Sequence, residues 1–248
     1  NNHDIRTRYW MTEVTQNATM TINLGTTSLT IDYQYSSQDR NYTNSRGDLI
    51  LNNASSTIIM AGRYWYDYSE SYWPRVIIDN TLSNYSYHTF STHGNFGLIK
   101  SVTPSEVRFN DSQPRGGSNT PFYINHLEVT SSAQFSGNVS FTTLKLRENG
   151  SIYTFAGGKT YSVSETFIIG QADGCAITTV KSNSPGTVAN LVSSATVTST
   201  YLDIQDISFT GVGSTTFTAN NSINNPNNNG INFGNLSPRN MYWIGGTG

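Results

Sequence analysis

Charge is scarce in this sequence. Lys, Arg, Asp and Glu together make up 12% of its 248 residues, about half of their share in an ordinary soluble domain. The formal net charge is −2, and the basic residues form no cluster, which argues against nucleic acid as a partner. The 16 acidic residues are scattered, whereas polysaccharide cleavage needs carboxylates brought together in pairs or beside a base. We therefore expect a chain that is not an enzyme.

Cysteine and long apolar segments are also missing. The single cysteine, Cys175, excludes a disulfide framework within the chain, and a lone thiol is most often a small buried hydrophobe. No apolar run reaches the roughly 18 residues of a membrane-spanning helix, so we expect no membrane insertion. No signal-peptide pattern opens the chain, which starts in mid-pattern at Asn1. We expect it to be a segment of a longer repetitive protein.

Small polar residues and aromatic residues dominate instead. The sequence holds 28 Asn, 31 Ser and 32 Thr, and 12% of its residues are aromatic, among them 15 Tyr. Thr, Tyr, Val and Ile favour strands, whereas Asn, Gly and Ser favour tight turns. Leu, Ala, Glu and Lys, which favour helices, are sparse. So many aromatic residues with so little charge are not typical of disorder, and the composition predicts a folded all-β chain.

Pairs of strand-forming residues at i, i+2 recur through the second half of the chain. The steps between their first members are 17, 17, 16, 20 and 20 residues. This spacing suits a β-solenoid with one coil per step or a β-sandwich with one hairpin per step. Asn149-Gly150 and Asp173-Gly174 suit two-residue hairpin turns, but the other gaps are longer and lack such a turn, so we favour the solenoid over the sandwich. The first members are Leu127, Leu144, Tyr161, Ile177, Val197 and Phe217.

The first half of the chain is less regular but also predicts strands. Pro and Gly interrupt the pattern in 111–121, which we interpret as a long corner and as the one candidate sub-boundary. The whole of 1–248 is expected to form one continuous solenoid segment. The expected strands are Thr19–Leu24, Ser28–Tyr33, Asp48–Leu51, Thr57–Met60, Arg75–Ile78, Asn95–Ile99 and Glu106–Phe109.

The C-terminal motifs resemble those of a known family. The order is "GKTYSVSETFIIG" (158–170), "GCAITTVKSNSPGTVANL" (174–191), "VTSTYLDIQDISFTG" (197–211), "TTFTANNSINNPNNNGINF" (215–233) and "YWIGGTG" (242–248). This succession resembles the repeat modules of giant surface adhesins of Bacteroidetes, including gliding-motility adhesins of the SprB type. The likeness covers about residues 155–248.

The resemblance implies a fold, a location and a role. It implies a right-handed parallel β-helix, export by type IX secretion and display on the outer cell surface. It further implies a non-catalytic module of a cell-adhesion protein, and the SprB-type members extend this expectation to gliding motility. The implied partners are a surface polysaccharide or another extracellular surface, and neighbouring repeat modules of the same chain.

The densest unusual feature is the aromatic segment 62–90, which holds nine aromatic residues in 29 positions. Residues alternate between the two faces of a strand, so Tyr64, Tyr66 and Tyr68 would share one face and Trp65 the other. Exposed Tyr and Trp give large contact area at low entropy cost and stack on sugars. We take the segment as a candidate glycan or protein contact surface. Its residues are Tyr64, Trp65, Tyr66, Tyr68, Tyr72 and Trp73, with Arg63 and Arg75 as hydrogen-bond donors.

Several alternatives stay open at this stage. The segment 62–90 could instead be a structural stack, which would make the chain a passive spacer or filament module. A polysaccharide-active β-helix enzyme is also possible, because only the fold could bring scattered carboxylates together. No cofactor is expected and the histidines lack metal-ligand spacing. Calcium would need acids that only the fold could bring together, because Asp203 and Asp206, at i, i+3 on a strand, would face opposite sides.

Overall fold

The fold was analysed in a computed structural model. It describes residues 5–7, 19–23, 28–31, 48–52, 57–60, 64–67, 72–73, 75–79, 86–92, 95–101, 106–111, 122–170 and 176–234. The predicted sub-boundary at 111–121 lies, apart from Asp111, outside these residues, and so does Cys175. On either side of that gap the pairing continues, because β10 (Asn95–Ser101) pairs with β12 (Phe122–Val129) and β11 (Glu106–Asp111) with β13 (Ala133–Phe135).

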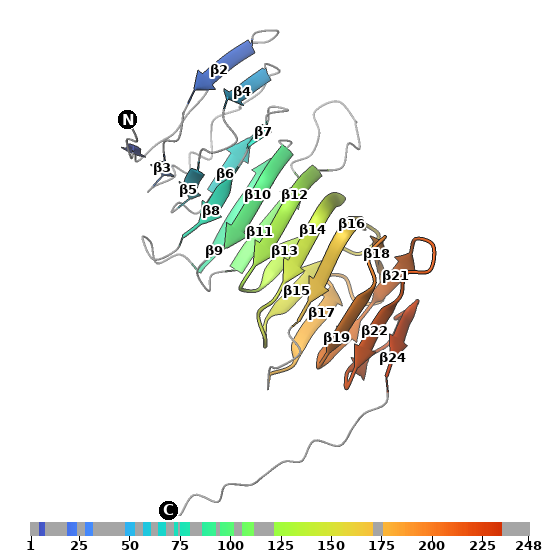
Figure 1. Cartoon of the computed structure of the whole chain (residues 1–248). Helices are drawn as coiled ribbons and strands as arrows, with labels where there is room; N and C mark the ends of the chain where they lie inside the picture. Colours follow the sequence, from blue (N-terminus) through green and yellow to red (C-terminus); the bar gives the residue numbers. More distant parts are fainter. Residues whose placement is uncertain are drawn as a thin grey trace, which may run out of the picture.

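The chain is a stack of coils, each contributing strands to parallel sheets that run along the length of the molecule (Figure 1). Every strand pairing between the described residues is parallel, which confirms the predicted all-β parallel β-helix. The β-sandwich alternative is wrong, because a sandwich of hairpins would pair its strands antiparallel. The seven strands expected between residues 19 and 109 are all present, within two residues of their expected bounds.

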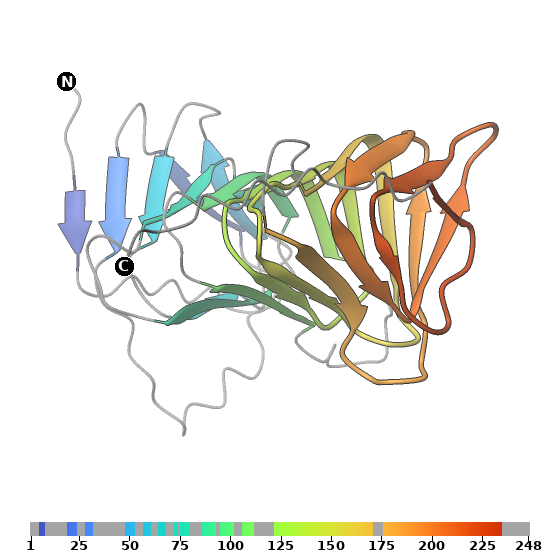
Figure 2. The same ribbon diagram turned by 90° about the horizontal axis from the view of Figure 1, so that it is seen from below.

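Sheet A has 13 strands, and sheet B faces it across the core of the middle coils (Figure 2). The strands of sheet A are β1 (Ile5–Thr7), β2 (Thr19–Asn23), β3 (Ser28–Ile31), β4 (Asp48–Asn52), β5 (Thr57–Met60), β7 (Tyr72–Trp73), β8 (Val76–Ile78), β10 (Asn95–Ser101), β12 (Phe122–Val129), β14 (Val139–Leu146), β16 (Thr160–Ile169), β18 (Ala189–Ser193) and β21 (Ile207–Gly211).

Sheets B and C complete the coils. Sheet B has eight strands: β6 (Tyr64–Asp67), β9 (Tyr87–Thr92), β11 (Glu106–Asp111), β13 (Ala133–Phe135), β15 (Ile152–Phe155), β17 (Thr178–Ser182), β20 (Leu202–Gln205) and β23 (Ile223–Asn224). Sheet C has three, found only in the last coils: β19 (Val197–Thr200), β22 (Phe217–Asn220) and β24 (Ile231–Phe233).

The coil changes shape toward the C-terminus. In the middle coils one long strand, such as β14 or β16, covers two sides, with a register irregularity between Phe141 and Thr143. The first half of β16 pairs with β18. Its second half lies against β19, where the Ser199 hydroxyl donates to the carbonyl of Ile169. Sheet C therefore continues the second half of sheet A, and the last coils have three short strands where the middle coils have one long strand and one short strand.

The register confirms some predicted steps and corrects others. Leu127 pairs with Leu144, and Val197 pairs with Phe217, as expected. Leu144 pairs on its other side with Phe167 rather than with Tyr161, because Tyr161 belongs to the other half of β16. An i, i+2 pair identifies a strand but not the side of the coil on which it lies, so the even spacing was partly coincidental.

A row of phenylalanines runs through the core along the axis of the stack. Each occupies the same register position in sheet B. The ring centroids of successive members lie 5.5, 5.1 and 5.0 Å apart, with interplanar angles of 19°, 7° and 9°. Phe96, Phe141 and Tyr161 of sheet A pack edge-on against this phenylalanine ladder. The ladder consists of Phe90, Phe109, Phe135 and Phe155.

Two buried tyrosines satisfy their hydroxyl groups inside the core. The Tyr161 hydroxyl accepts from the amide of Ala156 and donates to the carbonyl of Phe135, both at 2.9 Å. The Tyr153 hydroxyl accepts from the amide of Glu148 at 3.0 Å. Burial raises the pKa of Tyr153 to about 12, so this side chain stays neutral at any physiological pH.

One corner residue of the last coils connects three successive coils. Asp206 is 1% exposed and has a φ of 55°. Its carboxylate accepts from the amide of Gly186 at 3.1 Å and from the side chain of Asn227 at 2.7 Å. Its backbone accepts from Ala189 in the coil before and donates to Pro226 in the coil after. The asparagine-rich segment 220–230 thus supplies corner hydrogen bonds, and Asn221 and Asn227 adopt the positive φ that Asn tolerates.

Phe135→Ala should lower the free energy of unfolding by about 3–5 kcal/mol, because it leaves a cavity among four packed aromatic rings. Gln134→Ala, on the exposed side of the same strand, should change it by no more than about 0.5 kcal/mol. Urea unfolding followed by circular dichroism measures both. Equal effects of the two substitutions would contradict the packed ladder.

Asp206→Ala should destabilise the last coils by about 2 kcal/mol, because it removes two hydrogen bonds to a carboxylate and puts a Cβ-bearing residue without a polar side chain at positive φ. Asp206→Asn should cost less, since Asn keeps one acceptor oxygen and tolerates this φ. Hydrogen exchange at the amides of Gly186 and Ala189 reports the loss locally. The same protection in Asp206→Ala as in the parent chain would rule out the corner role.

Candidate functional site

The structure divides five of the candidate aromatic residues between two short strands that follow each other in the chain but belong to different sheets. Tyr64, Trp65 and Tyr66 lie on β6 of sheet B, and Tyr72 and Trp73 form β7 of sheet A. Arg63 and Tyr68 lie outside the described residues. Arg75 is exposed, and its carbonyl accepts from the amide of Ile58.

The register of β6 divides its aromatic residues into two groups. Trp65 pairs with Phe90, the first member of the phenylalanine ladder, so its position belongs to an inward row. Tyr64 pairs with Thr89, which faces outward but is only 5% exposed, and Tyr66 pairs with Ser91. Residues alternate between the two faces of a strand. The two tyrosines therefore occupy positions in the outward rows of sheet B.

The same reasoning applies to β7. Trp73 pairs with Phe96, which is fully buried, and Tyr72 pairs with Asn95. Trp73 thus occupies an inward row of sheet A and Tyr72 an outward one. The register brings only the tyrosine positions to an outer face, and the two tryptophan positions belong to the core rows.

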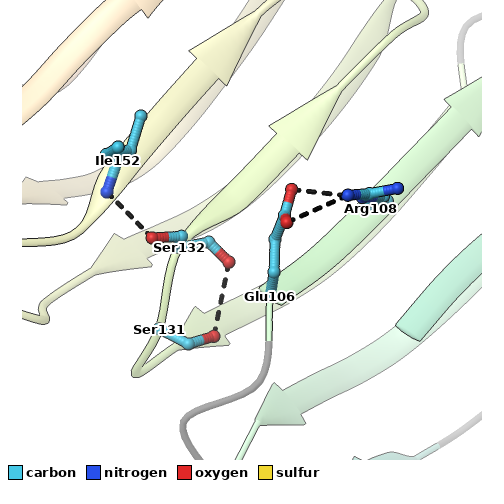
Figure 3. A network of polar contacts seen from close by, with 5 residues as sticks. All are labelled: Glu106, Arg108, Ser131, Ser132 and Ile152. Carbon is cyan, nitrogen blue, oxygen red and sulfur yellow. Dashed lines mark hydrogen bonds and ion pairs between the residues drawn. The ribbon is translucent and has the colours of Figure 1, made fainter. Parts of the chain in front are cut away.

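The outer face of sheet B next to these positions carries a charged pair and a further aromatic ring. Arg108 of β11 donates from Nε and from a terminal nitrogen to the two carboxylate oxygens of Glu106, each at 3.2 Å (Figure 3). The Arg108 guanidinium carbon lies 3.8 Å from the centroid of the Tyr87 ring. Arg108 pairs in register with Thr89, and Glu106 pairs with Tyr87. Tyr87 is half-buried, so part of its surface remains open to solvent.

These side chains extend the candidate surface beyond the sequence prediction, which omitted Tyr87, Glu106 and Arg108 from the site. Glu and Arg at i, i+2 on a strand share a face, so the pair itself was visible in the sequence. Its position beside β9 was not visible, because the pairing of β9 with β11 depends on the lengths of the corners between them. We call Tyr64, Tyr66, Tyr87, Glu106 and Arg108 the sheet B platform.

Toward the next coils the same face turns to hydroxyl groups and an aliphatic side chain. The Ser132 hydroxyl accepts from the amide of Ile152 at 2.9 Å, and the Ser131 hydroxyl donates to the carbonyl of Ser132 (Figure 3). The Ile152 side chain is 44% exposed. The serines tie one corner to the next coil, so this end of the face is rigid and polar.

The carboxylates of Asp203 and Asp206 already accept hydrogen bonds from side-chain amides. Asn225 donates to Asp203, and Asp206 is the buried corner residue described above. Within the described ranges, no three His, Cys, Asp or Glu side chains lie close enough together to hold a metal ion.

Comparisons with known proteins identify no relative of this chain. No helix of the described residues is long and apolar enough to cross a membrane. No protein-family model matches the sequence, and neither curated proteins nor solved structures include a match to it.

Proposed function

We propose that this chain is a non-catalytic adhesion module of a bacterial cell surface that binds neutral glycans through the sheet B platform. The observation that carries this proposal is the register of β6. It sets the position of Tyr64 in the outward row of Thr89 and Arg108, next to the row of Tyr87 and Glu106, and that of Tyr66 in the outward row of Ser91 and Asn110. A parallel ladder repeats each row about every 4.8 Å, which gives an extended polysaccharide a straight and stiff surface to lie on.

Ring stacking and hydrogen bonding would act together on such a ligand. Tyrosine rings offer apolar area to the flat faces of sugar rings and lose little side-chain entropy on binding. Glu106 and Arg108 offer acceptors and donors for sugar hydroxyls at the same surface. Because Arg108 is paired with Glu106 and covered by Tyr87, its charge is compensated. The platform therefore suits neutral sugars better than acidic ones.

The display part of the proposal is supported by the C-terminal motifs. The glycines in the segments that resemble the adhesin repeats stand at corners of the coil. Gly158, Gly186 and Gly230 have φ values of 73°, 81° and 70°, which other residues rarely adopt. These motifs therefore lie at turns of the coil, and turns of this kind can recur in every further coil. They fit a module secreted to the outer surface by the type IX route and flanked by neighbouring repeats of the same chain.

A passive spacer is the second candidate function. The phenylalanine ladder and the continuous sheets favour it, because they make a stiff rod whether or not a face binds anything. The two functions differ in the role of the tyrosines, which matter for attachment in the first and not in the second.

The double substitution Tyr64→Ser/Tyr66→Ser should weaken binding to a neutral polysaccharide by about tenfold or more, because two stacking surfaces are lost. Retention on beads carrying glucan, mannan or galactan measures it. Tyr123→Ser is the matched control, since Tyr123 is 38% exposed on the other long sheet and bonds to Thr142. The far-ultraviolet circular dichroism should not change in either variant.

Two results would contradict the proposed function. Binding that is equal in the double variant and in the parent chain, or absent in both on all three glycans, would favour the spacer. Release of reducing ends or unsaturated sugars from any of the glycans would instead show an enzyme.

Trp65→Ser should behave differently from the tyrosine substitutions, because its position continues the phenylalanine ladder. We expect a loss of about 3 kcal/mol or more in stability, comparable to other large-to-small core substitutions. Chemical denaturation of Trp65→Ser beside Tyr64→Ser measures the difference. A Trp65→Ser variant that is as stable as Tyr64→Ser would show that β6 has been assigned the wrong faces.

A further inference from the structure

The outer face of sheet A carries a cluster of cations around one carboxylate. Lys100, Glu128 and Lys145 stand in register on β10, β12 and β14, and Arg147 follows β14 two residues beyond Lys145. The Lys100 ammonium lies 3.2 Å from one carboxylate oxygen of Glu128. With three cations to one carboxylate, the cluster has an excess charge of +2 in a chain whose net charge is −2.

The neighbouring cations change the pKa of Glu128. Burial acts to raise its pKa, but the hydrogen bond and charge of Lys100, with the charges of Lys145 and Arg147, outweigh burial and lower it. His126 Nε2 lies 3.7 Å from the other carboxylate oxygen. Burial and the charge of Lys145 lower the pKa of His126 despite this carboxylate, so the imidazole is mainly neutral at pH 7 and adds little charge.

Two of the three cations are not neutralised by a partner. Lys145 forms no ion pair with the residues that the structure describes. The Arg147 Nε is buried and finds no hydrogen-bond acceptor in that part of the chain. Because this Nε has no contact with solvent, a bound oxyanion would contact the terminal guanidinium nitrogens of the half-buried Arg147 side chain.

We propose that Lys145 and Arg147 form a binding site for the carboxylate or sulfate groups of an acidic polysaccharide. The planar Arg fork matches the oxygen pair of a carboxylate or sulfate, and Lys adds a mobile point charge. Lys100 holds Glu128 to one side and so limits its repulsion of the incoming anion. The site stands on a different sheet from the sheet B platform and does not depend on it.

The width of the cluster favours a polysaccharide over nucleic acid. Ile77 and Ile168 occupy the register positions on either side of Lys100 and Lys145, so the charged row is three strands wide, about 10 Å at the usual strand spacing. That width accommodates one or two anionic sugar units. Tight nucleic-acid binding commonly engages about 6–10 phosphates, which is more than this row can reach.

Titration with three probes tests the site: polygalacturonate for carboxylates, dextran sulfate for sulfates and neutral dextran as the uncharged reference. The parent chain should bind at least one polyanion in 50 mM salt and more weakly as salt rises. Lys145→Gln/Arg147→Gln should weaken that binding by about tenfold or more, and Lys145→Gln alone, at a half-buried surface position, by several-fold. The control Lys181→Gln, which removes a cation from sheet B, should leave it unchanged. Glu128→Gln should strengthen it, because it removes the one negative charge.

Three outcomes would overturn the proposal. They are no binding of either polyanion at low salt, the same loss with Lys181→Gln as with Lys145→Gln, and tighter binding of a single-stranded DNA oligonucleotide than of either polysaccharide. Any binding of neutral dextran should be the same in all four variants, so that a failure of this site is distinguishable from a failure of the sheet B platform.

Discussion

The parallel backbone ladder is the constraint on which the rest of this structure depends. It sets each residue over its counterpart in the coil below, about 4.8 Å away, so like side chains can stack along the axis. Phe109, Phe135 and Phe155 stack at 5.1 and 5.0 Å for this reason. The spacing of their rings is the spacing of the strands. Because each coil contacts mainly its neighbours, stiffness and stability add along the stack.

The same ladder converts the alternation of each strand into rows on the outside of the molecule. On sheet B the row beside β6 combines tyrosine positions with an Arg108 that is balanced by Glu106. On sheet A the row through Glu128 has more cations than it can balance. Two faces of one rod thus carry different side-chain chemistry, although neither has a dense motif in the sequence. The contacts proposed above would depend on the repetition of each row along a straight line.

Much of the fold was predictable, because strand composition and i, i+2 pairs are local properties. The pairing of Leu127 with Leu144 was predicted correctly, and the same step of 17 residues places Glu128 beside Lys145. The proximity of Glu128 and Lys145 could therefore be predicted from the sequence. The pairing of Lys100 with Glu128 was not, because it spans a corner of a length that no local pattern reveals. Likewise, alternation separated Trp65 from Tyr64 and Tyr66, but only the pairing with Phe90 shows which of them belongs to the core row.

The last coils keep the buried apolar core of the middle ones but add hydrogen bonds at a corner. After Phe155 the ladder position passes to Ser182, and Asp206 follows Gln205, the residue that pairs with Lys181. There the coil has three short sides, and corner hydrogen bonds from Asp206 to Gly186 and Asn227 connect the coils. Such corners are formed by small polar residues and glycine. Their hydrogen bonds do not depend on which side chains fill the core. The proposed function likewise assigns different roles to these two groups of coils. Corner-bonded coils suit repetition along a long protein, whereas the aromatic coils before them carry the side chains of the proposed contact surface.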